Sequence, residues 1–255
     1  MTASSIGLQL YSVRGECQAD LPATLKAVAD IGYVGVEPYG YGGDTMVWQG
    51  HGAVEIRTML DDLGLVCCGI HLRTDALLGD NLARTIEFNR ILGNRYLIIA
   101  ADGPRMKSLD EIAELAGILN ETVGALTEHD MFTGYHAHAF DAADVEGTPA
   151  WFRLFGQVAP EVVMQMDVGN YFSGDGDPIA AMRAFPNRAR TVHVKDRNAP
   201  EEGAIGQGEA PVMEFLELCA DLHATEWYVV EECAPGGLGF EVVARAYNAL
   251  CGLMG

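Results

Sequence analysis

Residues 96–129 read YLIIAADGPRMKSLDEIAELAGILNETVGALTEH, a short apolar run followed by a longer segment whose apolar residues recur with helical spacing. The run at 96–100 is typical of a β-strand. Ser108 and Glu111 match a capping box, which predicts a helix from Ser108 to about His129. The stretch is therefore one strand–helix unit, and the fold depends on how often the unit recurs.

The same rhythm extends from one end of the chain to the other. Seven further strands are predicted at 6–12, 33–37, 65–71, 131–138, 162–167, 190–195 and 227–231. Seven further helices are predicted at 21–31, 54–63, 81–92, 149–158, 178–185, 211–222 and 240–253. Eight such units in 255 residues match the α/β fold known as the (β/α)8 or TIM barrel.

A doubly wound open sheet also alternates strands and helices. It would place a G-x-G-x-x-G turn after the first strand and would use fewer units, and neither feature fits this sequence. We therefore expect a single-domain TIM barrel over residues 1–255. Active sites of such barrels lie at the carboxyl ends of the strands, which tells us where to search for functional residues.

The charge balance excludes several classes of partner. The chain carries 16 Lys+Arg against 36 Asp+Glu, a net charge of −20. Proteins that bind nucleic acid or anionic membranes need a cationic surface, so we expect neither partner. The N-terminal residues lack the pattern of a secretory signal, and no apolar stretch is long enough to span a bilayer. The six cysteines form no C-x-x-C pair and are interpreted as reduced thiols of a cytoplasmic protein.

Acidic and imidazole side chains gather at the ends of the predicted strands. Four of the seven histidines lie there, at positions 71, 136, 138 and 193. Asp167 ends the sixth strand and Glu231 the eighth, so both should converge with His193 and a strand-five histidine. Such a mixed nitrogen and oxygen set suits Mn²⁺, Co²⁺, Zn²⁺ or Mg²⁺ and leaves coordination positions for a substrate.

Alternative roles remain open for these residues. His193 alone could be a hydrogen-bonded core histidine, and Asp167 before Gly169 could be a turn residue. His136 and His138 point to the same face of their strand, so either could be the ligand. Lys195 could act as an acid, a base or an oxyanion partner, or could form a salt bridge with a neighbouring carboxylate.

Seven strand-end motifs together resemble the sugar phosphate isomerase/epimerase superfamily, the xylose isomerase-like TIM barrels. They are LQLYSVR (8–14), GYVGVE (32–37), GYHAH (134–138), MDVG (166–169), VHVKD (192–196), GQG (206–208) and WYVVE (227–231). The resemblance implies a divalent metal held by His136 or His138 together with Asp167, His193 and Glu231. Many members carry a glutamate at the strand-five position, whereas this chain resembles a branch with a Tyr-His-Asn-His pattern. Ala137 replaces the asparagine of that branch, and Asp141 stands where the branch often has glutamate.

The function expected from such a site is isomerisation or epimerisation of a sugar or keto-sugar through a metal-stabilised enediolate. Glu231 is expected to combine metal binding with proton transfer, and Lys195 and Glu37 are the next candidates for proton transfer or for binding a substrate hydroxyl. Expected substrate contacts are His71, His136, Gln9 and Tyr11.

The sequence contains no phosphate-binding loop of the G-x-x-x-x-G-K-[ST] type, so a neutral sugar is favoured over a sugar phosphate; Arg14 and Arg73 are the main reservations. A lyase or dehydratase acting on a keto-inositol or keto-sugar is the alternative. A DNA-repair endonuclease or an inactive binding barrel is less favoured, because the net charge is negative and the expected ligands are intact. Homo-oligomers are common among similar barrels.

Overall fold

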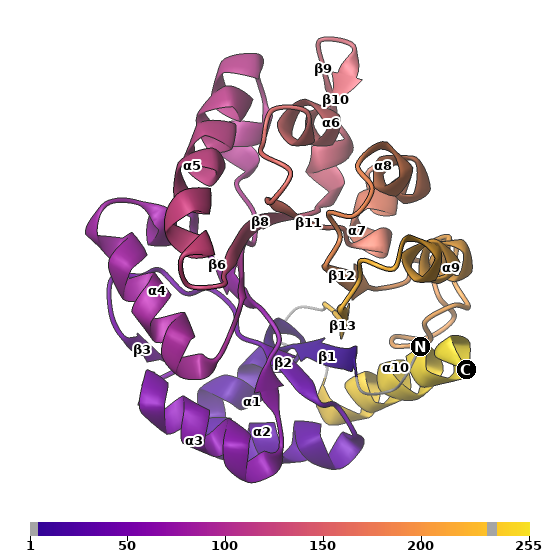
Figure 1. Ribbon diagram of the computed structural model, residues 1–255. Coiled ribbons are helices and arrows are strands. Elements are labelled where there is room, and N and C mark those ends of the chain that lie inside the picture. The colour runs from indigo at the N-terminus through magenta and orange to yellow at the C-terminus, as the bar shows by residue number, and fades with distance from the viewer. Residues whose placement is uncertain (1–4, 234–238) are drawn as a thin grey trace.

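The computed structural model describes residues 5–233 and 239–255, which form a ring of strands inside a ring of helices (Figure 1). The expectation of no secretory signal rests partly on residues 1–4, which lie outside the described residues. Within the described part of the chain, no helix is long and apolar enough to cross a membrane.

Eight parallel positions make up the inner ring. They are β1 (Ile6–Gln9), β2 (Gly35–Glu37), β5 (Val66–Cys67) continued by β6 (Ile70–Leu72), β7 (Tyr96–Ile99), β8 (Phe132–His136), β11 (Val163–Gln165), β12 (Thr191–Val194) and β13 (Trp227–Val230). Neighbouring strands follow the chain order, and β1 pairs with both β2 and β13. The predicted TIM barrel is confirmed.

The hydrogen-bonded strands form two sheets, β12-β13-β1-β2-β5 and β11-β8-β7-β6. One junction lies within the third barrel position, where the strand breaks at Cys68 and Gly69. The other lies between β11 and β12, where a single parallel bridge joins Asp167 to His193 and the His193 N–H donates to the Met166 carbonyl at 2.8 Å. We call this second junction the Asp167–His193 seam.

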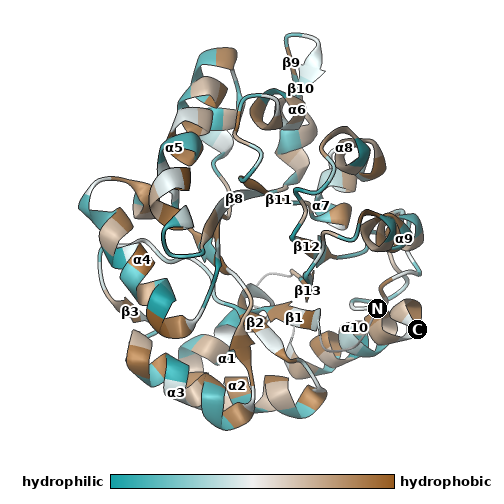
Figure 2. Ribbon diagram, viewed as in Figure 1, coloured by the Kyte–Doolittle hydropathy of each residue, from teal (hydrophilic) through white to brown (hydrophobic). Residues whose placement is uncertain are grey.

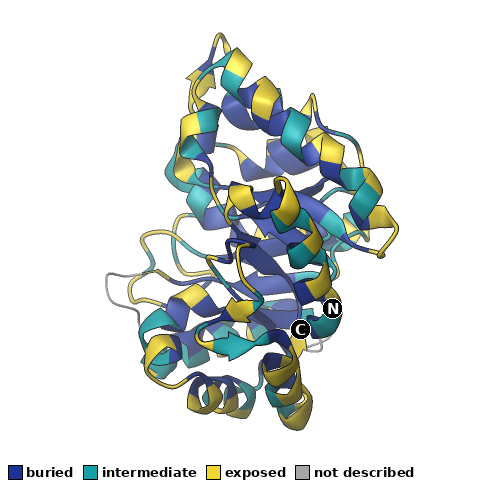
Figure 3. Cartoon of the chain, turned by 90° about the vertical axis from the view of Figure 1, so that its left-hand side faces the viewer, coloured by how far each residue is buried: buried dark blue, intermediate teal, exposed yellow. Residues whose placement is uncertain are grey.

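The outer ring contains the helices that the sequence predicts, with ends shifted by a few residues. They are α2 (Leu21–Ile31), α3 (Ala53–Leu63), α4 (Asp80–Leu92), α5 (Leu109–Thr127), α6 (Ala150–Phe155), α8 (Pro178–Ala184), α9 (Val212–Leu222) and α10 (Gly239–Met254). Ser108 caps α5, since its hydroxyl accepts from the Glu111 N–H at 3.3 Å. The apolar faces of the helices turn toward the strands, and most residues of the barrel strands are buried (Figures 2 and 3).

Several elements were not predicted. The first strand was expected to reach residue 12, but it ends at Gln9 because the Gln9 side chain accepts from the Tyr11 N–H at 3.0 Å and starts a 3₁₀ turn. Helices α1 (Arg14–Ala19) and α7 (Val168–Ser173) and two small hairpins were also missed. The hairpins are β3–β4 (Val47–Trp48 and His51–Gly52) and β9–β10 (Asp144–Val145 and Thr148–Pro149). Both hairpins follow barrel strands, so they extend the same end of the barrel.

Candidate metal centre

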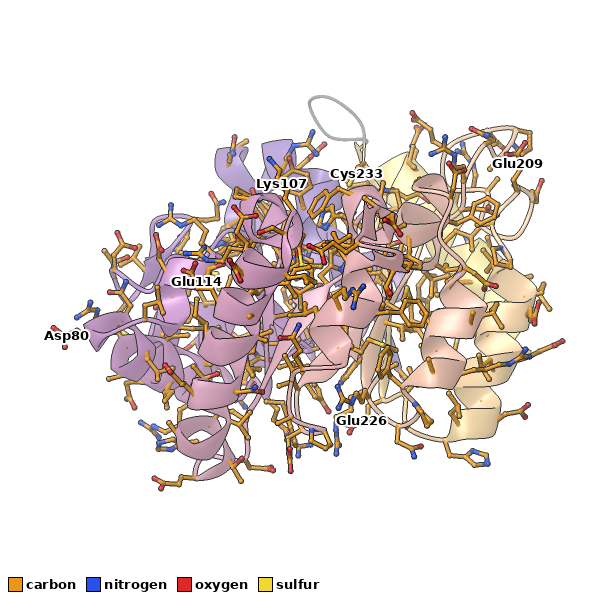
Figure 4. All side chains as sticks on the ribbon, turned by 90° about the horizontal axis from the view of Figure 1, so that it is seen from above. Asp80, Lys107, Glu114, Glu209, Glu226 and Cys233 are labelled. Atoms are coloured by element: carbon orange, nitrogen blue, oxygen red, sulfur yellow. The ribbon has the colours of Figure 1, made fainter. Side chains whose placement is uncertain are left out.

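The carboxyl ends of the strands bring the predicted polar residues to one end of the barrel. Figure 4 is turned by 90° from Figure 1 and shows the barrel from its side. Cys233 and Glu226, which lie just beyond the two ends of β13, are at its upper and lower edges. Six acidic and histidine residues lie near the Cys233 edge, and each residue is at most 6% exposed: Glu37, His71, His136, Asp167, His193 and Glu231. Buried charges at such density require mutual pairing or a cation.

Four of these side chains form a compact set of donors. His136, Asp167, His193 and Glu231 each offer one ligand atom, and these atoms lie within 4.8 Å of one another. The Nε2 atom of His136 lies 3.5 Å from Glu231 Oε2 and 3.9 Å from Asp167 Oδ2. Of the two strand-five histidines, His136 belongs to this set. A second group, His71, His136 and His193, shares two of its members.

Several polar atoms of this set have no hydrogen-bond partner, as expected of atoms that bind a cation. Both ring nitrogens of His136 and the Oδ2 atom of Asp167 are buried without a hydrogen-bond partner in the described structure. Buried polar atoms rarely remain unpaired, so each such atom calls for an explanation. Two imidazoles and two carboxylates are ligands that Mn²⁺, Zn²⁺ and Co²⁺ accept, and the residues therefore fit a divalent metal.

Local structure explains why Asp167 can serve such a set. The residue is the N-cap of α7, and its Oδ1 atom accepts from the Asn170 N–H at 2.8 Å. This bond fixes the carboxylate and leaves Oδ2 facing His136. Gly169 is needed beside it, because a Cβ there would lie 2.6 Å from the Lys195 carbonyl oxygen. The turn role and the ligand position are thus compatible in one residue.

His193 lies between two carboxylates. Its Nδ1 atom is 2.7 Å from Glu231 Oε2, and its Nε2 atom is 2.6 Å from Glu37 Oε2. Burial by itself would lower the pKa of His193, but the two glutamates raise it to about 10. Burial would likewise raise the pKa of Glu37, yet His71 and His193 lower it. Without a metal, His193 is therefore a buried imidazolium.

The other ionisable groups differ in charge. Burial and the neighbouring histidines lower the pKa of His136, so its ring is neutral, as a metal ligand must be. Burial raises the pKa of Asp167 to about 6, against the opposing charge of Lys195. Burial disfavours the charge of Lys195, but Asp167 and Glu231 outweigh it and raise the pKa of this lysine. Lys195 therefore stays protonated, and its Nζ donates to Asn170 Oδ1 at 3.2 Å.

Two glutamine side chains hold Glu37 and His71 beside the ligand set by hydrogen bonds, a role that the sequence did not predict for them. Gln165 donates to Glu37 Oε1 at 2.8 Å, and its Oε1 atom lies 2.7 Å from His71 Nε2. Gln9, expected as a substrate contact, donates to Glu37 Oε2 at 2.8 Å and is fully buried. The role of Gln165 could have been suspected from its position two residues before Asp167, because alternation along a strand places both side chains on the inner face.

A cavity of about 270 Å³ opens above the set. It is lined by Tyr11, Tyr39, Gly40, His71, Ala100, His136, His138 and Glu231. Three of the four expected substrate contacts therefore line it: Tyr11, His71 and His136. His138 reaches the same cavity with its Nδ1 atom unpaired. Among the residues of the described ranges, no lysine or arginine lines it.

Asp141 fixes the backbone beside His138. Its Oδ2 atom accepts from the His138 N–H at 2.7 Å, and the Tyr135 hydroxyl donates to its Oδ1 atom at 3.3 Å. The side chain is fully buried, so it supports the cavity wall and does not face a substrate. Burial raises the pKa of Asp141 to about 8.

This raised pKa predicts a pH-dependent loss of stability. Between about pH 4 and pH 8 the unfolded chain ionises Asp141 while the folded chain keeps it protonated, so folding stability falls as the pH rises. We expect Asp141→Asn to be more stable than the natural chain by about 1–3 kcal/mol at pH 8 and nearly equal at pH 4. Thermal unfolding of both proteins at several pH values measures this, and parallel pH profiles would contradict it.

Comparison with known proteins gives the following matches. The family model described as xylose isomerase-like TIM barrel matches residues 25–247. No curated protein matches the sequence. A sugar phosphate isomerase/epimerase structure from Parabacteroides distasonis is 24% identical, with a TM-score of 0.83 over 98% of this chain and 94% of that one.

Two further structures are similar at lower identity. A D-psicose 3-epimerase solved in the presence of D-fructose is 14% identical, with a TM-score of 0.72 over 98% of this chain and 100% of that one. A probable 3-DHS dehydratase from Bacillus anthracis is also 14% identical, with a TM-score of 0.63 over 96% of this chain and 98% of that one. At these identities the likeness shows the fold.

Proposed function

The chain belongs to the xylose isomerase-like TIM barrel family, and from this premise we propose that it is a divalent-metal-dependent isomerase or epimerase of a small uncharged sugar. The family membership confirms the resemblance found in the sequence, and it supports an enzyme that acts on small carbohydrates. The metal, the substrate and the reaction are our proposal.

The observation that carries the proposal is the donor set beneath the cavity. His136, Asp167, His193 and Glu231 are close enough for one cation, and Glu231 and His136 also line the cavity. A sugar bound there would meet the ligand set directly. None of the described residues that line the cavity is basic, which favours an uncharged sugar over a sugar phosphate, because a phosphate group would require a cationic partner.

A divalent ion bound by this set would supply a Lewis acid that stabilises negative charge developing on the sugar oxygens. The side chains of the protein would position the sugar and move its protons. Tyr11, which is 41% exposed at the cavity, offers an aromatic face and a hydroxyl to the sugar. Glu231 lines the cavity, and its Oε2 atom lies 2.7 Å from His193 Nδ1, so the metal would hold both side chains beside the sugar.

Two groups of the cavity wall can exchange a proton with a sugar carbon. Burial raises the intrinsic pKa of Glu231, but its hydrogen bond and charge contact with His193 lower the pKa overall, so the carboxylate is ionised. Burial lowers the pKa of His138 to about 4, which leaves a neutral imidazole in the cavity wall. We assign Glu231 and His138 as the proton-transfer pair, with Lys195 as a fixed positive charge beside Asp167 and Glu231.

Incubation with sugars in D₂O tests the reaction. The metal-loaded protein is mixed with a panel of aldoses, ketoses and keto-inositols, and the products are followed by NMR. We expect deuterium to enter an intact sugar at the carbon whose proton is exchanged, together with an isomer or epimer. A dehydrated product would instead support the lyase alternative. No exchange with any sugar, from a protein that holds its metal, would contradict the proposal.

A further inference from the structure

Glu37 was expected to take part in proton transfer, but its surroundings point to another role. It ends β2, is fully buried and is absent from the residues that line the cavity. Its carboxylate accepts three short hydrogen bonds, from Gln9 and His193 at Oε2 and from Gln165 at Oε1. A fourth neighbour is the Nε2 atom of His71, which lies 3.3 Å from Glu37 Oε2. A carboxylate so enclosed has no open approach to a substrate.

The contact with His193 fixes which ring nitrogen is available to a cation. An ionised carboxylate can only accept hydrogen bonds, so Nε2 of His193 carries the proton that it donates to Glu37 at 2.6 Å. The opposite nitrogen, Nδ1, faces Glu231 Oε2 at 2.7 Å and thus points into the ligand set. When a cation replaces the Nδ1 proton, the Nε2–H bond to Glu37 can persist.

We propose that Glu37 is a positioning residue that holds His193 in the Nε2–H form, with Nδ1 directed at the metal. This inference rests on the proposed metal site and assigns the support of one of its ligands. A carboxylate behind a metal-bound histidine fixes the ring orientation and raises the basicity of the ligand. Gln9 and Gln165 take part by holding the carboxylate from two other sides.

Metal affinity of matched variants tests the inference. Metal-free natural protein, Glu37→Gln and Glu232→Gln are titrated with Co²⁺ at pH 8 against a chromophoric chelator, and the visible absorption of bound Co²⁺ is recorded. Glu232 is the control because it is a nearly buried acid next to Glu231 that makes no hydrogen bond or ion pair with His193 among the described contacts.

We expect one Co²⁺ per chain in all three proteins. Glu37→Gln should bind about 10- to 100-fold more weakly and show a changed Co²⁺ spectrum, and Glu232→Gln should stay within about threefold of the natural protein. An affinity of Glu37→Gln within threefold of the natural value would overturn the inference, as would an equal loss in Glu232→Gln. If the natural protein itself binds no Co²⁺, the proposed metal function fails and the inference fails with it.

A second measurement needs no variant and remains decisive if Glu37→Gln does not fold. The natural protein is labelled with ¹⁵N-histidine and loaded with ¹¹³Cd²⁺, whose coupling to nitrogen identifies the bound atom. We expect coupling to Nδ1 of His193 and a proton on its Nε2. Coupling to Nε2 of His193 would overturn the inference even when the metal is bound.

Discussion

Asp167→Ala and Glu231→Ala proteins are expected to lose their stoichiometric divalent metal and to lose at least about 10³-fold in kcat/KM. Each substitution removes one of four side chains whose ligand atoms lie within 4.8 Å of one another. The remaining buried charges then lose a carboxylate that offsets them. Metal analysis of the purified proteins and steady-state kinetics on the sugar identified in D₂O measure the two effects.

Asp177→Ala is the matched control for the aspartate. Asp177 caps α8 as Asp167 caps α7, and its Oδ1 atom accepts from the Ala180 N–H at 2.9 Å. It is exposed and is not in the ligand set. We expect this variant to lose about 1 kcal/mol of stability through the cap and to keep its metal. Unchanged metal content in both Asp167→Ala and Glu231→Ala would rule out the site.

Gly69→Ala is expected to destabilise the protein by about 3 kcal/mol or more and to weaken metal binding. A Cβ at this position would lie 2.3 Å from Glu37 Oε1, far inside van der Waals contact. The carboxylate cannot withdraw without breaking its bonds to Gln165, Gln9 and His193. Chemical denaturation measures the stability, and Co²⁺ titration measures the metal affinity.

Gly117→Ala is the control for Gly69→Ala, because the same substitution is expected to stabilise the protein at this position. Gly117 lies within α5, and nothing lies within 4 Å of the Cβ that alanine would add. Alanine has the higher helix propensity, so this variant should gain up to about 1 kcal/mol. If both variants shifted stability in the same direction, the close approach of Gly69 to Glu37 would not be the cause.

The fold could be predicted because each barrel unit carries its own signals. The strand at 96–99 and the helix that begins after Ser108 follow from local periodicity and a cap. The close approach of Gly69 to Glu37 could not be predicted, since Glu37 belongs to another strand. The hairpins also gave no usable signal, because their strands are only two residues long.

The clustering of the polar side chains could be predicted from the sequence, but their individual contacts could not. Carboxylates and imidazoles at strand ends pointed to a metal centre, since few other roles bring so many buried charges together. The choice of His136 over His138 depends on contacts with Asp167 and Glu231, which lie on other strands. The supporting role of Gln165 depends on partners 94 and 128 residues away along the chain, and no local pattern records them.

The Asp167–His193 seam gives the ligand set a consequence beyond catalysis. His136 ends β8, and Asp167 lies just after β11 of the same four-stranded sheet. His193 lies in β12, and Glu231 follows β13 of the five-stranded sheet. An ion held by all four would cross-link the two sheets of the barrel at this seam. Because a ligand that binds only the folded state shifts the folding equilibrium by mass action, the lifetime of the chain in a cell would follow the supply of metal. Metal starvation would then reduce the amount of this protein through degradation, as well as the activity of each copy.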